Sequence, residues 1–309
     1  MIRIEEGQLP VVGAADENYA LYLLVAFTSA LINTKDKSKL AFFCIDGGIL
    51  PKTRTLILKK MEELGSSITF IQVDGTQYDG YKVIKHLSKV AYYRLSIPEL
   101  FSGKANKVLY LDCDLIVLGD LLDLLPVEFN RQPVAAIEDI SRHSHLHTNL
   151  QREDYINSGV LLINIDEWNN QKINSKVFSA LENKSIDNDQ CAINIAVNGT
   201  WLRLPLVWNH QFGLYRNKKY LIKNYGKSEL NQALFYPKIV HFISSDKPWN
   251  KICYHPWQDV YLKYAGIAGV SLEKATFLEK LIASTTSFRS FKNYLRLIMR
   301  SKQLKRFKN

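Results

Sequence analysis

Two aspartates in the stretch KVLYLDCDLIVLGD, residues 107 to 120, have the clearest chemical potential in the chain. Asp112 and Asp114 follow an apolar run that is typical of a buried strand. Alternate residues of a strand point to the same face, so the two carboxylates can converge on one point. Carboxylates this close resist burial unless a cation or a proton lies between them. The pair predicts a site for a hard divalent cation, Mn²⁺ or alternatively Mg²⁺, that would bridge the protein to phosphate groups.

Two other readings of these residue types stay open at this point. An aspartate pair alone also fits a turn with solvated carboxylates, although aspartates that end a core strand need a specific reason. His143, His145 and His147 alternate along the chain and could suggest zinc. No cysteine or carboxylate nearby completes a tetrahedral ligand set, so we interpret this segment as a flexible loop over an acceptor site.

The composition is that of a folded protein with a sizeable core. The chain has 309 residues, of which 47% are hydrophobic, enough for one large domain or two smaller ones. The four cysteines are far apart and form no CxxC pair, which favours reduced, buried thiols. The polar N-terminus is unlike a secretory signal, and the apolar stretch 21–32 is too short to span a bilayer. We therefore expect a soluble, cytoplasmic protein.

Positive charge is concentrated at the C-terminus. Residues 287–309 carry eight lysines and arginines and no acidic residue, and removing these eight charges from the total of +10 leaves +2. Phe288, Phe291, Leu295 and Ile298 recur among them at helical spacing. This pattern is typical of a helix lying on an anionic membrane surface, with a solvated tail as the alternative. It lacks the aromatic array and the fold of a nucleic-acid-binding segment, so we expect no nucleic acid partner.

The elements that must position the aspartates alternate between strands and helices. Apolar runs at 9–15, 39–48, 67–75 and 107–117 predict strands, and Gly65 should end the second helix. The intervening segments 16–32, 53–65 and 88–101 predict helices, the first capped by Asp16 and the third stopping near Pro98. Further strand-like runs lie at 133–140, 155–168, 201–210 and 238–249, and 183–199 predicts a loop leading into a helix.

This alternation predicts an α/β fold of right-handed βαβ units, with a mostly parallel sheet and helices on both faces. Ligands bind such sheets at the carboxyl ends of the strands, where the residues after 15 and after 111 should meet. We expect a catalytic domain over residues 1–265 and a helical, basic C-terminal extension over 266–309.

Six ordered blocks together resemble a known family. They are AADENY (14–19), SKVAYYRL (88–95), VLYLDCDLIV (108–117), INSGVLLIN (156–164), DNDQCAIN (187–194) and HFISSDKPW (241–249). Over residues 10 to 265 the chain resembles the retaining nucleotide-sugar glycosyltransferases of family 8, the group that includes glycogenin and bacterial lipooligosaccharide galactosyltransferases and glucosyltransferases. The resemblance implies a single Rossmann-like domain of the GT-A type and UDP as the carrier of the sugar.

The resemblance also assigns a nucleotide site and a metal site. His241 would complete the metal site with Asp112 and Asp114, and Lys247 would offer a charge to the β-phosphate. Ser244 stands where the family has glycine, which puts the local geometry of that phosphate contact in doubt. The start of a capped helix is the alternative role for Asp16. The nucleotide would lie against Ala14, Ala15, Asp16, Asn18, Tyr19, Cys113 and Lys247.

A sugar site follows from the same resemblance, with Asp189 and Gln190 as its catalytic pair. An N-cap role for Asp187 or Asp189 is the structural alternative. Because an amide is a poor nucleophile, we favour attack by the acceptor on the same face over a covalent intermediate at Gln190. A leaving-group phosphate oxygen would then take the acceptor proton. The sugar site would comprise Arg94, Asp139, Asn157, Asp189 and Gln190.

The sequence therefore predicts an Mn²⁺-dependent enzyme that moves glucose or galactose from a UDP-sugar to a glycan, glycolipid or glycoprotein acceptor in bacterial cell-surface biosynthesis. Residues 271–309 would hold it peripherally at an anionic membrane and take no part in the chemistry. One alternative is a nucleotidyltransferase, which would need a third acidic ligand and a phosphate-binding loop. The other is a non-catalytic module that binds nucleotide sugars, which would not require metal ligands and diphosphate contacts together.

Overall fold

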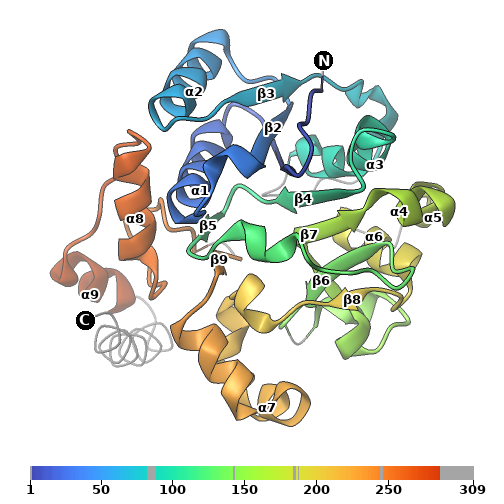
Figure 1. Cartoon of the computed structure of the whole chain (residues 1–309). Coiled ribbons are helices and arrows are strands. Elements are labelled where there is room, and N and C mark those ends of the chain that lie inside the picture. The colour runs from blue at the N-terminus through green and yellow to red at the C-terminus, as the bar shows by residue number, and fades with distance from the viewer. Residues whose placement is uncertain are drawn as a thin grey trace.

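A seven-stranded sheet forms the centre of the protein. The computed structural model describes residues 2–81, 88–141, 143–183, 186, 188–243 and 246–285. The strands lie in the order β3-β2-β1-β4-β7-β6-β8 (Figure 1). The pairs β3·β2, β2·β1, β1·β4 and β6·β8 are parallel, whereas β7 runs antiparallel to both of its neighbours. The predicted mostly parallel α/β sheet is confirmed.

The first four strands begin within a residue of where the apolar runs predicted them, and the third and fourth end earlier. They are β1 (Leu9–Ala15), β2 (Leu40–Asp46), β3 (Ile68–Ile71) and β4 (Lys107–Leu111). Val11 pairs with Leu109 in parallel register, so the carboxyl ends of β1 and β4 meet at one edge of the sheet. The remaining strands of the sheet are β6 (Val134–Glu138), β7 (Ile156–Asn164) and β8 (Leu202–Arg203). The run 201–210 therefore contributes only a two-residue strand.

The prediction of one strand over 107–117 is wrong. β4 ends at Leu111, and the chain turns through the two aspartates into β5 (Leu115–Val117). β5 leaves the main sheet and pairs antiparallel with β9 (Ile239–His241), with Leu115 opposite His241. The break follows from chemistry, because the two carboxylates need solvent or a cation and cannot continue a fully buried ladder. Its consequence is that His241 lies beside the aspartates.

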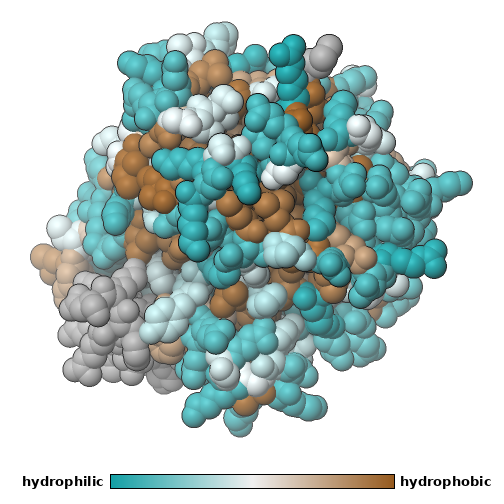
Figure 2. Space-filling view, in the orientation of Figure 1, coloured by the Kyte–Doolittle hydropathy of each residue, from teal (hydrophilic) through white to brown (hydrophobic). Residues whose placement is uncertain are grey.

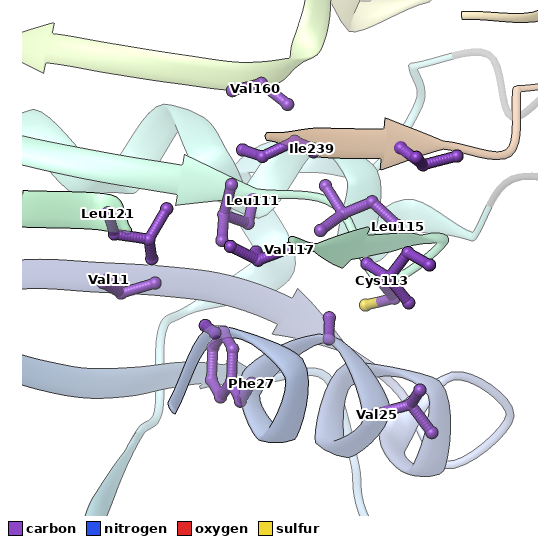
Figure 3. Close-up of a cluster of buried hydrophobic side chains, with 14 of the residues drawn as sticks. Val11, Val25, Phe27, Leu111, Cys113, Leu115, Val117, Leu121, Val160 and Ile239 are labelled. Atoms are coloured by element: carbon purple, nitrogen blue, oxygen red, sulfur yellow. The ribbon is translucent and has the colours of Figure 1, made fainter. Parts of the chain in front are cut away.

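Helices cover both faces of the sheet, as predicted (Figure 1). One apolar layer joins the sheet to α1 (Ala20–Asn33), α2 (Pro51–Glu63), α7 (Lys218–Phe235) and α8 (Gln258–Ile267). The other layer joins it to α3 (Ile97–Phe101), α4 (Ile165–Asn170), α5 (Ile173–Leu181) and α6 (Asp189–Val197). Figure 3 shows the first layer, where Phe27 of α1, Leu111 of β4 and Ile239 of β9 converge.

Short 3-10 turns connect many of these elements. They are η1 (Lys37–Lys39), η2 (Gly75–Tyr78), η3 (Lys89–Ser96), η4 (Leu121–Leu124), η5 (Ser144–His147), η6 (Arg152–Asp154), η7 (Leu206–Trp208) and η8 (Phe212–Tyr215).

Two helix boundaries differ from the prediction. The segment 88–101 is η3 followed by α3, and Pro98 lies in the first turn of α3 rather than at a helix end. Proline suits a first turn because the amide proton that it lacks would have no partner there. Asp16 does not cap α1, which begins at Ala20; its carboxylate instead accepts from the amides of Asn18 and Tyr19 in the preceding turn. Gly65, with a φ of +76°, follows the end of α2 as predicted.

The described chain ends in α9 (Phe277–Thr285), which exposes apolar side chains. Phe277, Leu278 and Ile282 are each at least 60% exposed, and Figure 2 shows hydrophobic surface at this position on an otherwise largely hydrophilic face. Among the described residues, no helix combines the length and the apolar character needed to cross a membrane. The basic segment 287–309, with its predicted apolar stripe, lies outside the described residues.

Candidate active site

A pocket of about 590 Å³ opens at the carboxyl ends of β1 and β4. Its wall combines the end of β1, the turn between β4 and β5, the start of α6 and the segment after β9. Every residue that the sequence assigned to the metal, nucleotide and sugar sites lines it, except Asn18 and Asp139. Asn18 is exposed, and Asp139 lies behind the wall in contact with Gln190. The topology thus gathers segments more than 200 residues apart in the sequence.

Asp112, Asp114 and His241 form a cluster with the donor types of a metal site. One ligand atom from each lies within 4.8 Å of the others. His241 Nε2 is 2.9 Å from Asp114 Oδ1 and 3.7 Å from Asp112 Oδ2. Gly159 of β7 makes room for them, since a Cβ atom there would collide with the His241 ring. Two carboxylates and an imidazole suit a divalent cation, so these residues could hold one.

Asn209 orients the imidazole of His241. Its side-chain oxygen lies 3.2 Å from His241 Nδ1, and its amide nitrogen donates to Asn157 Oδ1 at 2.8 Å. An oxygen partner at Nδ1 favours a proton on that nitrogen, so that Nε2 would be available as a ligand when a cation is bound between the aspartates. Histidines that bind metals commonly use their second nitrogen in this way.

Two cations flank the aspartates. Lys247 Nζ bonds the carboxylate of Asp114 and also donates to the Phe242 carbonyl at 2.9 Å. Burial alone would raise the pKa of Asp114, but the charges of His241 and Lys247 outweigh burial and hold that pKa well below its ordinary value. Asp114 is therefore ionised at neutral pH. On the other side, Arg94 Nη2 is 3.0 Å from Asp112 Oδ1.

Arg94 ties the aspartate pair to α6. Its guanidinium is buried, with Nε 2.9 Å from Asp189 Oδ2 and Nη1 donating to the Ser158 carbonyl at 2.6 Å. It also lies 4.5 Å above the Tyr110 ring. Burial raises the pKa of Asp189, and the charge of Arg94 offsets part of that effect. Arg94 thus fixes one wall of the pocket while part of its charge faces Asp112.

Gln190 is the centre of a hydrogen-bond network. Its Nε2 donates to Asp139 Oδ2 at 2.8 Å, and its Oε1 accepts from the Ser158 amide at 3.0 Å and from Asn157 Nδ2 at 3.2 Å. Both ends of the side-chain amide are therefore engaged by the protein. Asn157 connects this network to Asn209, and through it to His241.

α6 places Gln190 and Asp189 at its first turn. The cap is Asn188, whose side chain accepts from the Cys191 amide at 2.8 Å. The N-cap alternative for Asp189 is therefore wrong, because Asp189 is the first helical residue. Asp187, the other cap candidate, lies outside the described residues.

The remaining wall is formed by small and aromatic residues. Ala14 and Ala15 are buried at the end of β1, and the Cys113 thiol donates to the Ala14 carbonyl at 3.2 Å. The Tyr19 ring lies beside them, edge-to-face with Trp249 at 5.9 Å between ring centroids. Two small side chains and an aromatic ring thus line this part of the pocket.

Two further features of the sequence are no part of the site formed by the described residues. Ser244, the departure from the family pattern, lies outside the described residues. The three histidines around η5 take no part in the acidic cluster at the pocket, which is the one candidate metal group among the described residues.

Three site residues were absent from the sequence interpretation. Tyr110 donates to Asp112 Oδ1 at 2.8 Å, and its position two residues before Asp112 could have indicated a shared face. Ser158 contacts both Arg94 and Gln190, and Asn209 orients His241. No local pattern marks these last two, because their partners lie 32 or more residues away.

Comparison with known proteins agrees with this geometry. The profile described as glycosyl transferase family 8 matches residues 10–253. General stress protein A of Bacillus subtilis is 33% identical over 262 residues, which span 82% of this chain and 92% of that protein. Lipopolysaccharide 1,2-glucosyltransferase of Escherichia coli is 27% identical over 80% of this chain and 75% of its own length. A solved complex of the galactosyltransferase LgtC with donor and acceptor sugar analogues superposes with a TM-score of 0.73 at 25% identity, covering 87% of this chain and 98% of LgtC.

Proposed function

The chain belongs to glycosyl transferase family 8, and on that premise we propose that it moves a hexose from a UDP-sugar to a glycan or glycoconjugate. The hexose would be glucose or galactose, transferred with retention of the anomeric configuration. The observation that carries the proposal is the convergence of Asp112, Asp114 and His241 beside Lys247 in one large pocket. A nucleotide diphosphate is well served by such a combination of metal ligands and a neighbouring lysine.

We assign the metal to Asp112, Asp114 and His241, with Mn²⁺ as the proposed ion. When bound, such an ion would neutralise negative charge on the diphosphate oxygens and so favour departure of UDP. Lys247 would place its ammonium against the same diphosphate, and Ala14, Ala15 and Tyr19 would hold the uracil. We leave Asn18 out of this nucleotide site, because its side chain is exposed and away from the pocket.

The state of Gln190 supports same-face attack rather than a covalent intermediate at that residue. Its carbonyl oxygen already accepts hydrogen bonds from Ser158 and Asn157, and an amide oxygen committed to donors is a weak nucleophile. In our proposal Gln190 lies against the sugar, Arg94 and Asp189 align its hydroxyls, and a phosphate oxygen of the leaving group takes the acceptor proton. An active-site glutamine-to-glutamate mutant of LgtC is among the similar structures.

We propose the acceptor class from the proteins to which the chain is similar. The similar proteins include a lipopolysaccharide glucosyltransferase and the glycosyltransferase GlyF of Streptococcus pneumoniae. We propose a cell-surface glycan, glycolipid or glycoprotein as acceptor, and a cytoplasmic enzyme held at the membrane through residues 271–309.

Incubation with a panel of UDP-sugars tests the function. UDP release should require Mn²⁺ or Mg²⁺, stop on addition of a chelator, and be fastest with UDP-glucose or UDP-galactose. Absence of release with every UDP-hexose and metal would contradict the proposal. Titration calorimetry of UDP with and without Mn²⁺ separates it from a binding module, whose affinity should be indifferent to the metal. Release of pyrophosphate from a nucleoside triphosphate would instead support the nucleotidyltransferase alternative.

A further inference from the structure

α9 follows Lys247 by about 30 residues in the sequence, yet hydrogen bonds through Gln258 connect it to the segment that carries Lys247. Lys280 of α9 donates from Nζ to Gln258 Oε1 and to the Cys253 carbonyl, both at 2.7 Å. Gln258, in the first turn of α8, is only 2% exposed. Its Nε2 donates to the carbonyls of Pro248 at 3.2 Å and Asn250 at 3.1 Å. One buried amide therefore joins α9 to both sides of Trp249.

The same segment is held from the opposite side by α1. The Trp249 ring stacks on Tyr22 with 3.7 Å between centroids and 5° between planes. Within the segment, the Asn250 amide donates to the Lys247 carbonyl at 3.1 Å. Lys247, immediately before Pro248, reaches into the pocket to Asp114 and the Phe242 carbonyl. The backbone that follows Lys247 is thus held by α1 through the Trp249 ring and by α8 and α9 through Gln258.

We propose that α9 is a positioning element of the donor site, in which Lys280 acts through Gln258 to fix the backbone that directly follows Lys247. The inference rests on the proposed function, because it takes the diphosphate as the partner of Lys247. A side chain that delivers charge to a phosphate is effective only where its position is set in advance. Removing Lys280 would leave Gln258 Oε1 without this donor in a buried site, so the amide would lose its fixed orientation.

The inference differs from a purely structural role for α9. Exposed ion pairs also join this region to the body of the protein, such as Lys274 Nζ to Asp259 Oδ1 at 2.5 Å and Lys251 Nζ to Glu279 Oε1 at 2.9 Å. Exposed pairs of this kind contribute little to stability. Lys274 is therefore a matched control: it is a lysine of the same region that pairs at the surface and makes no contact with Gln258 among the described hydrogen bonds.

The test compares Lys280→Met with Lys274→Met in the full chain. Calorimetry should show the affinity for UDP in the presence of Mn²⁺ falling about tenfold in Lys280→Met, in the range usual for residues that orient a ligand-binding group. KM for the UDP-hexose should rise with it, while Lys274→Met stays at the wild-type value. Equal affinities in the two variants would overturn the inference. So would a Lys280→Met enzyme with a lowered Tm but an unchanged KM, which is the outcome of a structural role alone.

A double-mutant cycle tests whether Lys280 acts through Gln258. If it does, adding Lys280→Met to Gln258→Leu should weaken UDP binding by less than it does in the wild-type background. Full additivity would overturn the proposed route even if each single variant binds weakly. Failure of the proposed function has a different signature, since the wild-type protein would then release no UDP from any UDP-hexose with metal present.

Discussion

The two halves of the pocket are built from opposite kinds of side chain. The charged half contains two carboxylates, an imidazole and two cations: Asp112, Asp114, His241, Lys247 and Arg94. The amide half contains neutral side chains that bond one another: Gln190, Asn157 and Asn209. Two hydrogen-bond links between the described residues join them: Asn209 bonds His241, and Ser158 bonds both Arg94 and Gln190.

This difference separates two tasks. Charges in a partly buried site interact strongly and respond to ions, so the charged half suits a diphosphate and its metal. Neutral amides contribute little net energy but fix direction, because each buried donor and acceptor must keep its partner. The amide half therefore suits the orientation of a sugar. Substitutions in the first half should abolish turnover, and substitutions in the second should slow it.

The largest effect is expected in the charged half. Asp112→Asn, Asp114→Asn and His241→Ala should each lower metal-dependent UDP release by about 10³-fold or more, because each removes one of the three proposed metal ligands. Circular dichroism should be unchanged. Asp123→Asn is the control, since that aspartate pairs with Lys238 at the surface and should leave turnover intact. Near-native turnover in the Asp112 variant or in the Asp114 variant would contradict the proposal that these residues bind the metal.

A smaller effect is expected in the amide half. Gln190→Ala should slow transfer by about 10²-fold, since it removes an oriented dipole rather than a charge. NMR of the anomeric proton should show a product with the α configuration of the donor. Intact-protein mass spectrometry should show no attached hexose. A β product, or a stable hexose adduct on Gln190 in the wild-type protein, would rule out same-face attack.

Asn209 tests the connection between the halves. Asn209→Ala should weaken the binding of UDP with Mn²⁺ about tenfold and leave metal-free binding of UDP unchanged. The reason is that the His241 ring loses the partner of its Nδ1 atom, while all three proposed metal ligands remain. Calorimetry with and without Mn²⁺ measures both values. Asn224→Ala is the matched control, an exposed asparagine of α7 outside the pocket. If the two variants bind equally, His241 keeps its orientation without Asn209 and the halves act separately.

The sequence predicted what depends on neighbours along the chain. β1 to β4 are apolar runs that fill both faces of a covered sheet, so their residues alone indicated strands and the edge where a ligand would bind. Asp112 and Asp114 were found because their own flanking residues made them unusual. The six blocks of family resemblance then supplied His241, Lys247 and Gln190, which no local rule would have joined to the aspartates.

What the sequence missed depends on distant partners. The apolar pattern of 107–117 is the same whether the last residues stay in the main sheet or pair with β9, and only the contact with Ile239–His241 decides it. Asn209 and Ser158 look like ordinary polar residues until folding brings His241 and Gln190 to them. The segment Lys89–Ser96 has the periodicity of a helix, but it folds as a 3-10 turn whose Arg94 is buried in the pocket wall against Asp189, a residue far along the chain.

The smallest effect on the pocket is expected from the basic tail. Truncation after residue 285 removes eight positive charges but keeps Lys280 and Gln258, so neither half should change and UDP-hexose hydrolysis should equal that of the full chain. Truncation after residue 270 also removes α9, and from the role inferred for Lys280 it should raise KM for the donor. The two truncations therefore separate the tail from α9.

Binding to vesicles, unlike catalysis, should depend on the basic tail. Each lysine or arginine near an anionic leaflet contributes about 1 kcal/mol, and the attraction weakens as salt screens it. Co-sedimentation should show the full chain on anionic vesicles at low salt, less of it at high salt, and neither truncated form. Neutral vesicles are the control, because burial of apolar side chains alone would give equal binding to neutral and anionic vesicles. Equal binding of the 1–285 protein, or equal binding to neutral vesicles, would contradict an electrostatic attraction of residues 287–309 to anionic membranes.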